Sequence, residues 1–173
     1  MSTPASQLSL NLSGRYIAAI RQLPCVSLQW PWWDLVRRGL KTIEARSWKL
    51  LHHGPLGIAS VKGQEHTGRP PEEHGALVAI VWLENCRPFG FGANDFDRAF
   101  PPEIRQAPDM DKLCNTILGQ LGLSPWAWVF RPGSAVPIEP PIPVRGRQGL
   151  FYLDADEEIR PHLEHLNITI QGI

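Results

Sequence analysis

Apolar residues fall into short runs separated by polar or proline-rich segments. Runs rich in β-branched and aromatic residues predict strands near 25–28, 40–48, 56–61, 76–89, 126–130 and 150–153. Pro31 suits the first turn of a helix that ends at Arg38, and Gly39 suits the left-handed residue after it. Asp109 can cap a second helix that runs to Leu121. This pattern predicts an α+β fold, namely a small, mostly antiparallel β-barrel with flanking helices.

The segments between these runs carry weaker signals. Residues 90–109 mix Gly, Phe, Asp and Pro, which predicts an irregular excursion. Residues 131–143 contain five prolines, and we expect an extended connector there because proline cannot donate to a central strand ladder. A last helix is expected after Asp154 or Asp156, ending near Leu166, and 168–170 is a candidate edge strand.

The chain has 173 residues, of which 43% are hydrophobic, so we expect one domain with a sizeable core. The net charge is +0, and no overall field draws the protein to nucleic acid or membrane. The bases are unevenly spread, however. Nine basic and three acidic side chains lie between Arg15 and Arg69, which predicts a local basic surface.

The three cysteines, Cys25, Cys86 and Cys114, are odd in number and form no C-x-x-C pair. We expect each to be a small core residue in a reducing, cytoplasmic compartment. No signal peptide or membrane-length apolar run is recognised, so no membrane partner is expected. We also expect a monomer without a metal or other cofactor.

The most informative stretch is 39–48, where the polar pattern changes to a period of two. As a strand it places Thr42, Glu44, Arg46 and Trp48 on one face, and Ile43 with its alternating neighbours on the other. A carboxylate, a guanidinium and a large ring on one short strand destabilise the fold unless they pair or bind something. The simplest interpretation is a surface ion pair, and the alternative is a binding site.

Three blocks in order resemble the ASCH domain of the PUA-like superfamily. They are Ser27-Leu28-x-x-Pro31-Trp32, then Gly39-x-Lys41-x-x-Glu44-x-Arg46-Ser47-Trp48, then Gly54-x-Leu56-x-Ile58-Ala59. The resemblance covers residues 23–154 and is nearest to the C-terminal ASCH domain of activating signal cointegrator-1. It leaves residues 1–22 as an N-terminal extension and 155–173 as a C-terminal helix and tail. It implies a PUA-like barrel with a cleft over the second block.

The resemblance also implies binding of RNA, another single-stranded nucleic acid or a nucleoside in that cleft. Lys41 and Arg46 are expected to neutralise phosphate, Glu44 to accept from a base or a ribose, and Trp32 or Trp48 to stack on a base. The full set of candidate contacts is Lys41, Glu44, Arg46, Trp32, Trp48, Gln29, Lys62, Arg145, Arg147 and Gln148. The chain departs from the family pattern beside Gln29, where Trp30 precedes the proline.

Catalysis is the alternative. Some relatives of this type are N4-acetylcytidine amidohydrolases and others are described as ribonucleases, so Lys41 and Glu44 are the candidate catalytic residues. The amidohydrolase pattern keeps the lysine but has a threonine where this chain has Glu44, and we therefore expect a binding protein rather than an enzyme. The zinc-deaminase signature and the Walker motif are both absent from the sequence.

Overall fold

The computed structural model describes residues 21–63, 68–90, 93–106, 109–122, 125–159 and 161–162. Its strands are β1 (Gln22–Leu28), β2 (Ile43–Arg46), β3 (Gly54–Ser60), β4 (Ala76–Pro88), β5 (Trp126–Phe130), β6 (Val136–Pro143) and β7 (Leu150–Asp154). Its helices are α2 (Trp32–Arg37), α3 (Ala93–Ala99), α4 (Pro102–Arg105) and α5 (Met110–Gln120), with short helical turns η2 (Pro71–Glu73) and η3 (Ala155–Ile159). The expected strand at 168–170 lies outside the described residues.

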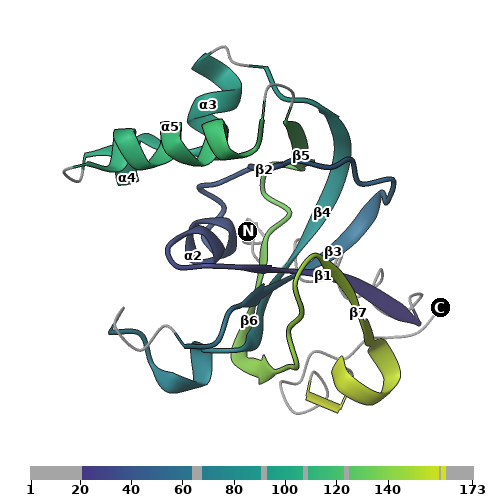
Figure 1. Cartoon of the computed structure of the whole chain (residues 1–173). Helices are drawn as coiled ribbons and strands as arrows, with labels where there is room; N and C mark the ends of the chain where they lie inside the picture. Colours follow the sequence, from purple (N-terminus) through teal and green to yellow (C-terminus); the bar gives the residue numbers. More distant parts are fainter. Residues whose placement is uncertain are drawn as a thin grey trace, which may run out of the picture.

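All seven described strands belong to one sheet in the order β2-β5-β4-β3-β1-β7, with β6 paired to β4 beside this path (Figure 1). Only the β1–β3 pair is parallel, and the other pairs are antiparallel. The parallel pair arises because the chain passes through α2 and β2 between these two strands. The expectation of a mostly antiparallel α+β fold is therefore confirmed.

The expected β-barrel is not closed, because the sheet is open. Strand β4 pairs with β3 along one edge, whereas its other edge is shared by β6 near Ala76 and by β5 near Cys86. The sheet thus branches at β4, and its path ends at β2 and β7, which do not pair with each other in the described structure. The start of β2 is instead held by α3, since the Thr42 N–H donates to the Arg98 carbonyl at 3.0 Å.

The proline-rich segment 131–143 is also different from the prediction, because most of it is strand β6. Its register places Pro137 opposite Ala79 and Pro143 opposite Ala76. Among the described strands, β6 pairs only with β4 and is therefore an edge strand. An edge strand tolerates proline, because it needs hydrogen-bond donors along only one of its two sides. The proline argument correctly excluded a central strand but missed an edge strand.

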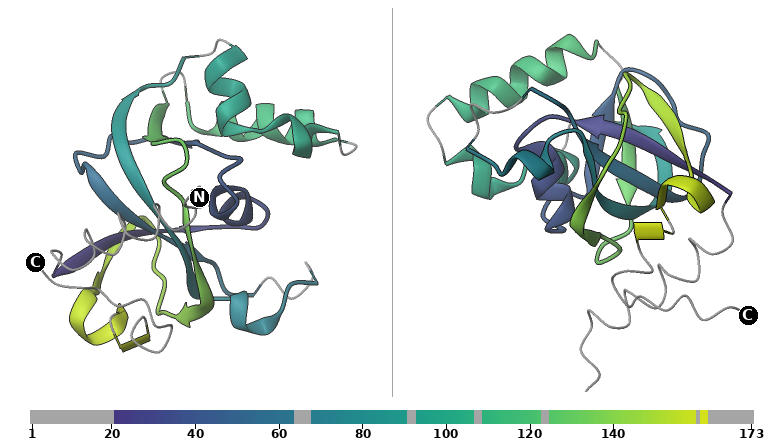
Figure 2. Two further views of the ribbon diagram at one scale, coloured as in Figure 1. Left: turned by 180° about the vertical axis from the view of Figure 1, so that it is seen from behind. Right: turned by 90° about the horizontal axis from the view of Figure 1, so that it is seen from below.

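The segment 90–109 is not irregular, because it contains α3 and α4. These helices and α5 gather at one end of the molecule beside β2 and β5, whereas η3 lies at the opposite end near β7 (Figures 1 and 2). Helix α5 begins after Asp109 as predicted, but this residue has a left-handed φ of 66° and makes no side-chain cap hydrogen bond. Helix α2 begins after Pro31 and is followed by Gly39 at a φ of 73°, as the sequence indicated.

Strand β2 separates the core from the polar site, as its alternation predicted. Ile43 and Ala45 are buried in a cluster with Phe100, Cys114 and other side chains of β5 and the three end helices. Glu44 and Arg46 point to the opposite face. All three cysteines are buried and free, in agreement with the sequence interpretation. None of the described helices has the length and apolar character needed to cross a membrane.

Candidate functional site

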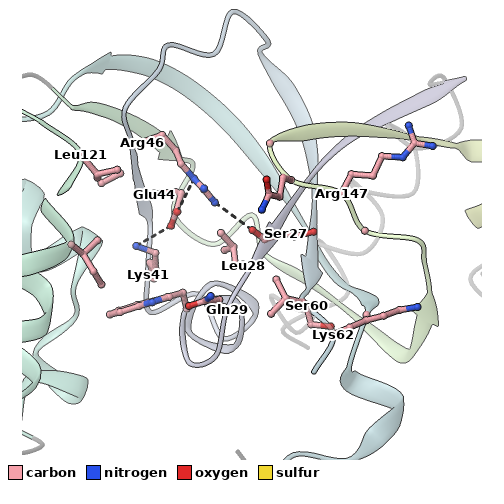
Figure 3. Close-up of a pocket in the computed structure, with 18 of the residues that line it drawn as sticks. Ser27, Leu28, Gln29, Lys41, Glu44, Arg46, Ser60, Lys62, Leu121 and Arg147 are labelled. Carbon is pink, nitrogen blue, oxygen red and sulfur yellow. Dashed lines mark hydrogen bonds and ion pairs between the residues drawn. The ribbon is translucent and has the colours of Figure 1, made fainter. Parts of the chain in front are cut away.

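A cavity of about 680 Å³ lies in the opening of the sheet, between β2 and the end of β1 (Figure 3). Further walls come from α2, from the end of β3, from the β6–β7 loop, from α5 and from Phe100, which directly follows α3. Eight of the ten candidate residues line it, namely Lys41, Glu44, Arg46, Trp32, Gln29, Lys62, Arg147 and Gln148. The volume falls within the range of about 300–1,000 Å³ that small-molecule sites occupy.

Lys41 lies at the base of the cavity and is only 3% exposed. Its ammonium donates to the carbonyls of Ile43 at 2.7 Å and Ala99 at 2.6 Å, and it contacts Glu44 Oε2 at 3.2 Å. An ammonium has three N–H donors, so each donor already has an acceptor. Lys41 therefore ties the start of β2 to the end of α3 and fixes Glu44, and it has no donor left for a ligand while these contacts persist.

The environment of Lys41 perturbs its protonation. Burial lowers the pKa of Lys41 from its usual range, because the charged form loses its hydration, while the nearby Glu44 carboxylate opposes this shift. The rings of Trp32 and Phe100 lie 5.4 and 5.3 Å from the ammonium and add cation–π attraction to the charged form. The site thus combines a desolvated amine with one carboxylate.

Arg46 spans the opening of the sheet. Its Nε lies 3.1 Å from Glu44 Oε1, and its Nη2 donates to the Ser27 carbonyl of β1 at 3.4 Å (Figure 3). This Nε–Oε1 contact is an ion pair without hydrogen-bond geometry, and Nε has no hydrogen-bond partner among the described residues. The side chain is 26% exposed, and no partner is found for Nη1 in the part of the chain that is described. Arg46 is therefore the cation of the motif that retains donors for a ligand.

The helical end of the cavity is apolar. Trp32 and Phe100 pack edge-on with ring centroids 5.6 Å apart, and Ile117 and Leu121 of the α5 region complete this wall. Trp32 is half-buried, whereas Phe100 is 2% exposed. Trp32 therefore serves both as a packing residue against the core and as part of the cavity surface.

The opposite rim is polar and exposed. It is formed by Lys62 after β3 and by Arg147 and Gln148 of the β6–β7 loop, whereas the exposed Gln29 lines the cavity beside Lys41, at the start of α2 (Figure 3). Arg145 belongs to the same loop and is exposed, but it does not line the cavity. The rim thus brings together residues that are far apart in the sequence.

Trp48 also lies away from the cavity lining. Its ring packs edge-on against Trp128 with centroids 4.6 Å apart, and its carbonyl accepts a hydrogen bond from Trp128 Nε1 at 3.2 Å. The structure therefore places Trp48 in the packing beneath Arg46, whose guanidinium lies 5.9 Å from the Trp128 ring. A stacking role for Trp48 at the ligand is not supported by this position.

Several lining residues were missed in the sequence, namely Ser27, Ser60, Phe100, Ile117 and Leu121. The apolar ones carried no signal, since each reads as an ordinary core residue of its own segment. Ser27 belongs to the first motif block, which was a usable signal. Ser60 exchanges two hydrogen bonds with the backbone of Ala76, so its role is structural. No group of three potential metal ligands is found in the described part of the chain.

Neither the known family models nor the curated proteins include a match to this sequence. Solved structures do match it. The ASCH protein from Zymomonas mobilis is 18% identical, with 85% of this chain and 96% of that chain covered and a TM-score of 0.52. A serine-to-alanine variant of that protein is 19% identical, with coverages of 84% and 96% and a TM-score of 0.53. This chain therefore has the fold of an ASCH domain.

Proposed function

We propose that this protein binds single-stranded RNA through a basic cleft and seats one unpaired nucleotide in the cavity at Glu44 and Arg46. The observation that supports it most directly is the composition of this cavity. One end is aromatic and aliphatic around the buried Lys41, and Figure 3 shows Lys62 and Arg147 on the side away from Leu121, with Arg46 between them. An unpaired nucleotide has the same division, because its base is flat and weakly polar whereas its phosphate is charged.

Arg46 is the residue on which binding is expected to depend most. A guanidinium with a free Nη1 can donate to a phosphate or to a base edge, and Glu44 holds its plane in place from the side. Glu44 Oε1 and Oε2 face Arg46 and Lys41, so the carboxylate serves first as a bridge between the two cations. Its remaining acceptor positions can take a hydrogen bond from a ribose hydroxyl.

The test is fluorescence anisotropy with short labelled single-stranded RNA, and with DNA of the same sequence. Arg46→Ala should weaken RNA binding by roughly tenfold or more, since hydrogen bonds to charged groups contribute about 1.5–3 kcal/mol. The matched control is Arg38→Ala, which removes an arginine directly after α2 whose side chain is 60% exposed and does not line the cavity. Absence of binding at low salt, or equal binding by both variants, would refute the proposal.

Salt dependence gives a second readout. The logarithm of the affinity should fall linearly with the logarithm of salt concentration, with a slope of about −0.7 for each phosphate contact to a single strand. A slope that is flatter by about one contact in Arg46→Ala would indicate that Arg46 contacts a phosphate, and an unchanged slope with weaker binding would indicate that it contacts a base edge. Preferential binding of RNA over DNA would indicate that the 2′-hydroxyl is contacted.

A second candidate is hydrolysis of a modified nucleoside or of RNA, with Lys41 as general base. The observation that favours it is the burial-lowered pKa of Lys41 beside the Glu44 carboxylate. Incubation with N4-acetylcytidine and with RNA distinguishes the two candidates when the Lys41→Arg variant is included, because arginine keeps the charge and does not deprotonate. Turnover that survives chelation of metals and is lost in folded Lys41→Arg would replace the binding proposal.

A further inference from the structure

We infer that the cavity takes a phosphorylated nucleotide in one direction, with its base at the Trp32 end and its phosphate between Lys62 and Arg147. This inference rests on the proposed nucleic-acid function and deepens it. It names the ligand unit as a nucleotide rather than a nucleoside. It also assigns the phosphate to two residues outside the central motif.

The helical end is unsuited to phosphate. Its surface consists of Trp32, Phe100, Ile117 and Leu121, and its cation, Lys41, already has an acceptor for each donor. A phosphate placed there would lose its hydration without gaining free N–H donors. A base placed there would lie against apolar and aromatic surface, where stacking is favourable.

The opposite end carries two cations. In Figure 3, Lys62 and Arg147 lie on the far side of the Glu44–Arg46 pair from Leu121. Both side chains are exposed, and neither forms an ion pair or a hydrogen bond with the part of the chain that the structure describes. They come from different segments, one after β3 and the other between β6 and β7, so the positive charge at this end of the rim is contributed from two parts of the chain.

Backbone features hold these two residues at the rim. The methylenes of Lys62 lie over Gly75, where a Cβ would come within 2.5 Å of Lys62 Cγ and where φ is 65°. The loop that carries Arg147 passes close to β1, since a Cβ at Gly146 would lie 2.9 Å from Ser27 Oγ. The absence of side chains at these two glycines therefore lets the Lys62 stem lie at the start of β4 and lets the Arg147 loop lie close to β1, which anchors both residues at the rim.

The test measures calorimetric affinities for adenosine and cytidine, each as the nucleoside, the 5′-monophosphate and the 3′-monophosphate. At low salt a monophosphate should bind roughly tenfold more tightly than its nucleoside. Lys62→Ala and Arg147→Ala should each weaken monophosphate binding about two- to fivefold, as expected for exposed charges, and leave nucleoside binding unchanged. Leu121→Ala should weaken both ligands by the same factor.

Matched controls are available for both cations. Arg145→Ala removes an exposed arginine from the same loop, and Lys112→Ala removes an exposed lysine from α5; neither residue lines the cavity. Both variants should bind the monophosphates as the wild type does. Equal losses in the control variants would overturn the inference, because the effect would then come from general surface charge.

A second measurement uses RNA in which one phosphate is replaced by an uncharged methylphosphonate, moved one position at a time. At one position the replacement should weaken binding to the wild type but not to the Lys62→Ala/Arg147→Ala double variant. If no position behaves in this way while RNA binding still depends on Arg46, the orientation is wrong and the proposed function stands. If neither RNA nor mononucleotides bind, both proposals fail.

Discussion

Replacement of Lys41 by methionine tests whether the buried ammonium organises the site. Methionine has an unbranched side chain of similar length and fills the same space without charge. The change leaves the carbonyls of Ile43 and Ala99 without this donor, and it leaves Glu44 paired only with Arg46. The start of β2 and the end of α3 thereby lose the ammonium link, and the hydrogen bond from the Thr42 N–H to the Arg98 carbonyl remains between them.

The magnitude follows from these contacts. Removal of one partner from a buried ion pair costs about 3–5 kcal/mol when the other charge is left uncompensated, and the remaining contact with Arg46 places Glu44 at the lower end of this range. The two carbonyls each add about 1–3 kcal/mol if no other donor replaces the ammonium, whereas the relieved desolvation of Lys41 offsets a similar amount. We therefore expect Lys41→Met to lower the free energy of unfolding by about 3–5 kcal/mol. In a chain of this length that corresponds to a melting temperature lower by roughly 6–20 °C.

The assay is urea unfolding followed by tryptophan fluorescence, since the chain contains seven tryptophans. Lys112→Met on the exposed face of α5 is the matched control, and it should change stability by no more than about 0.5 kcal/mol. A double-mutant cycle with Glu44→Gln should give a coupling energy of about 0.5–3 kcal/mol. A loss below about 1 kcal/mol for Lys41→Met, with no coupling to Glu44, would refute the structural role assigned to the ammonium.

Three further predictions concern residues that do not line the cavity. Arg87 and the Gly90 N–H hold the pKa of Asp95 below its usual value of about 3.9. The Asp95 carboxylate therefore stabilises the fold fully at pH values above this usual pKa. The stabilisation is lost as the pH falls through the lower pKa of the folded state. Asp95→Asn should therefore be less stable than the wild type at pH 7, with a difference that shrinks on acidification in unfolding curves; a constant difference would contradict this. Gly57→Ala should cost about 1–3 kcal/mol, because its Cβ would overlap Cys25 Sγ in the packed core, and an unchanged melting temperature would show that the core can adjust. Trp48→Leu should lower stability by about 1–3 kcal/mol without changing RNA affinity, and a selective loss of binding would restore Trp48 to the ligand site.

Local patterns in the sequence were sufficient for the elements whose cause is local. The helix between Pro31 and Gly39 depends on a fixed φ at its start and a positive φ at its end, and both are properties of single residues. The two faces of β2 follow from its alternation, so the placement of Ile43 in the core and of Glu44 toward the cavity could be predicted. The motif blocks likewise indicated the ASCH fold that the structural comparisons support.

Elements whose cause is nonlocal could not be predicted in this way. Helices α3 and α4 are too short for an apolar period to be visible, and β6 is stable only because β4 offers it an unpaired edge. Whether a sheet closes depends on which edges meet, and no pattern within a single strand contains that information. The open path from β2 to β7 was therefore decided by tertiary pairing alone.

The same division applies to the site. The sequence by itself determined which side chains carry the chemistry, since Lys41, Glu44 and Arg46 lie within six positions on one strand and its approach. Only the tertiary structure decided their roles. The carbonyl of Ala99, 58 positions away, occupies a donor of Lys41, and this contact leaves Arg46 as the cation that faces a ligand. The physical reason is that the acceptors around a buried cation determine both its pKa and whether it has N–H donors left for a ligand. Folding brings those acceptors from distant parts of the chain.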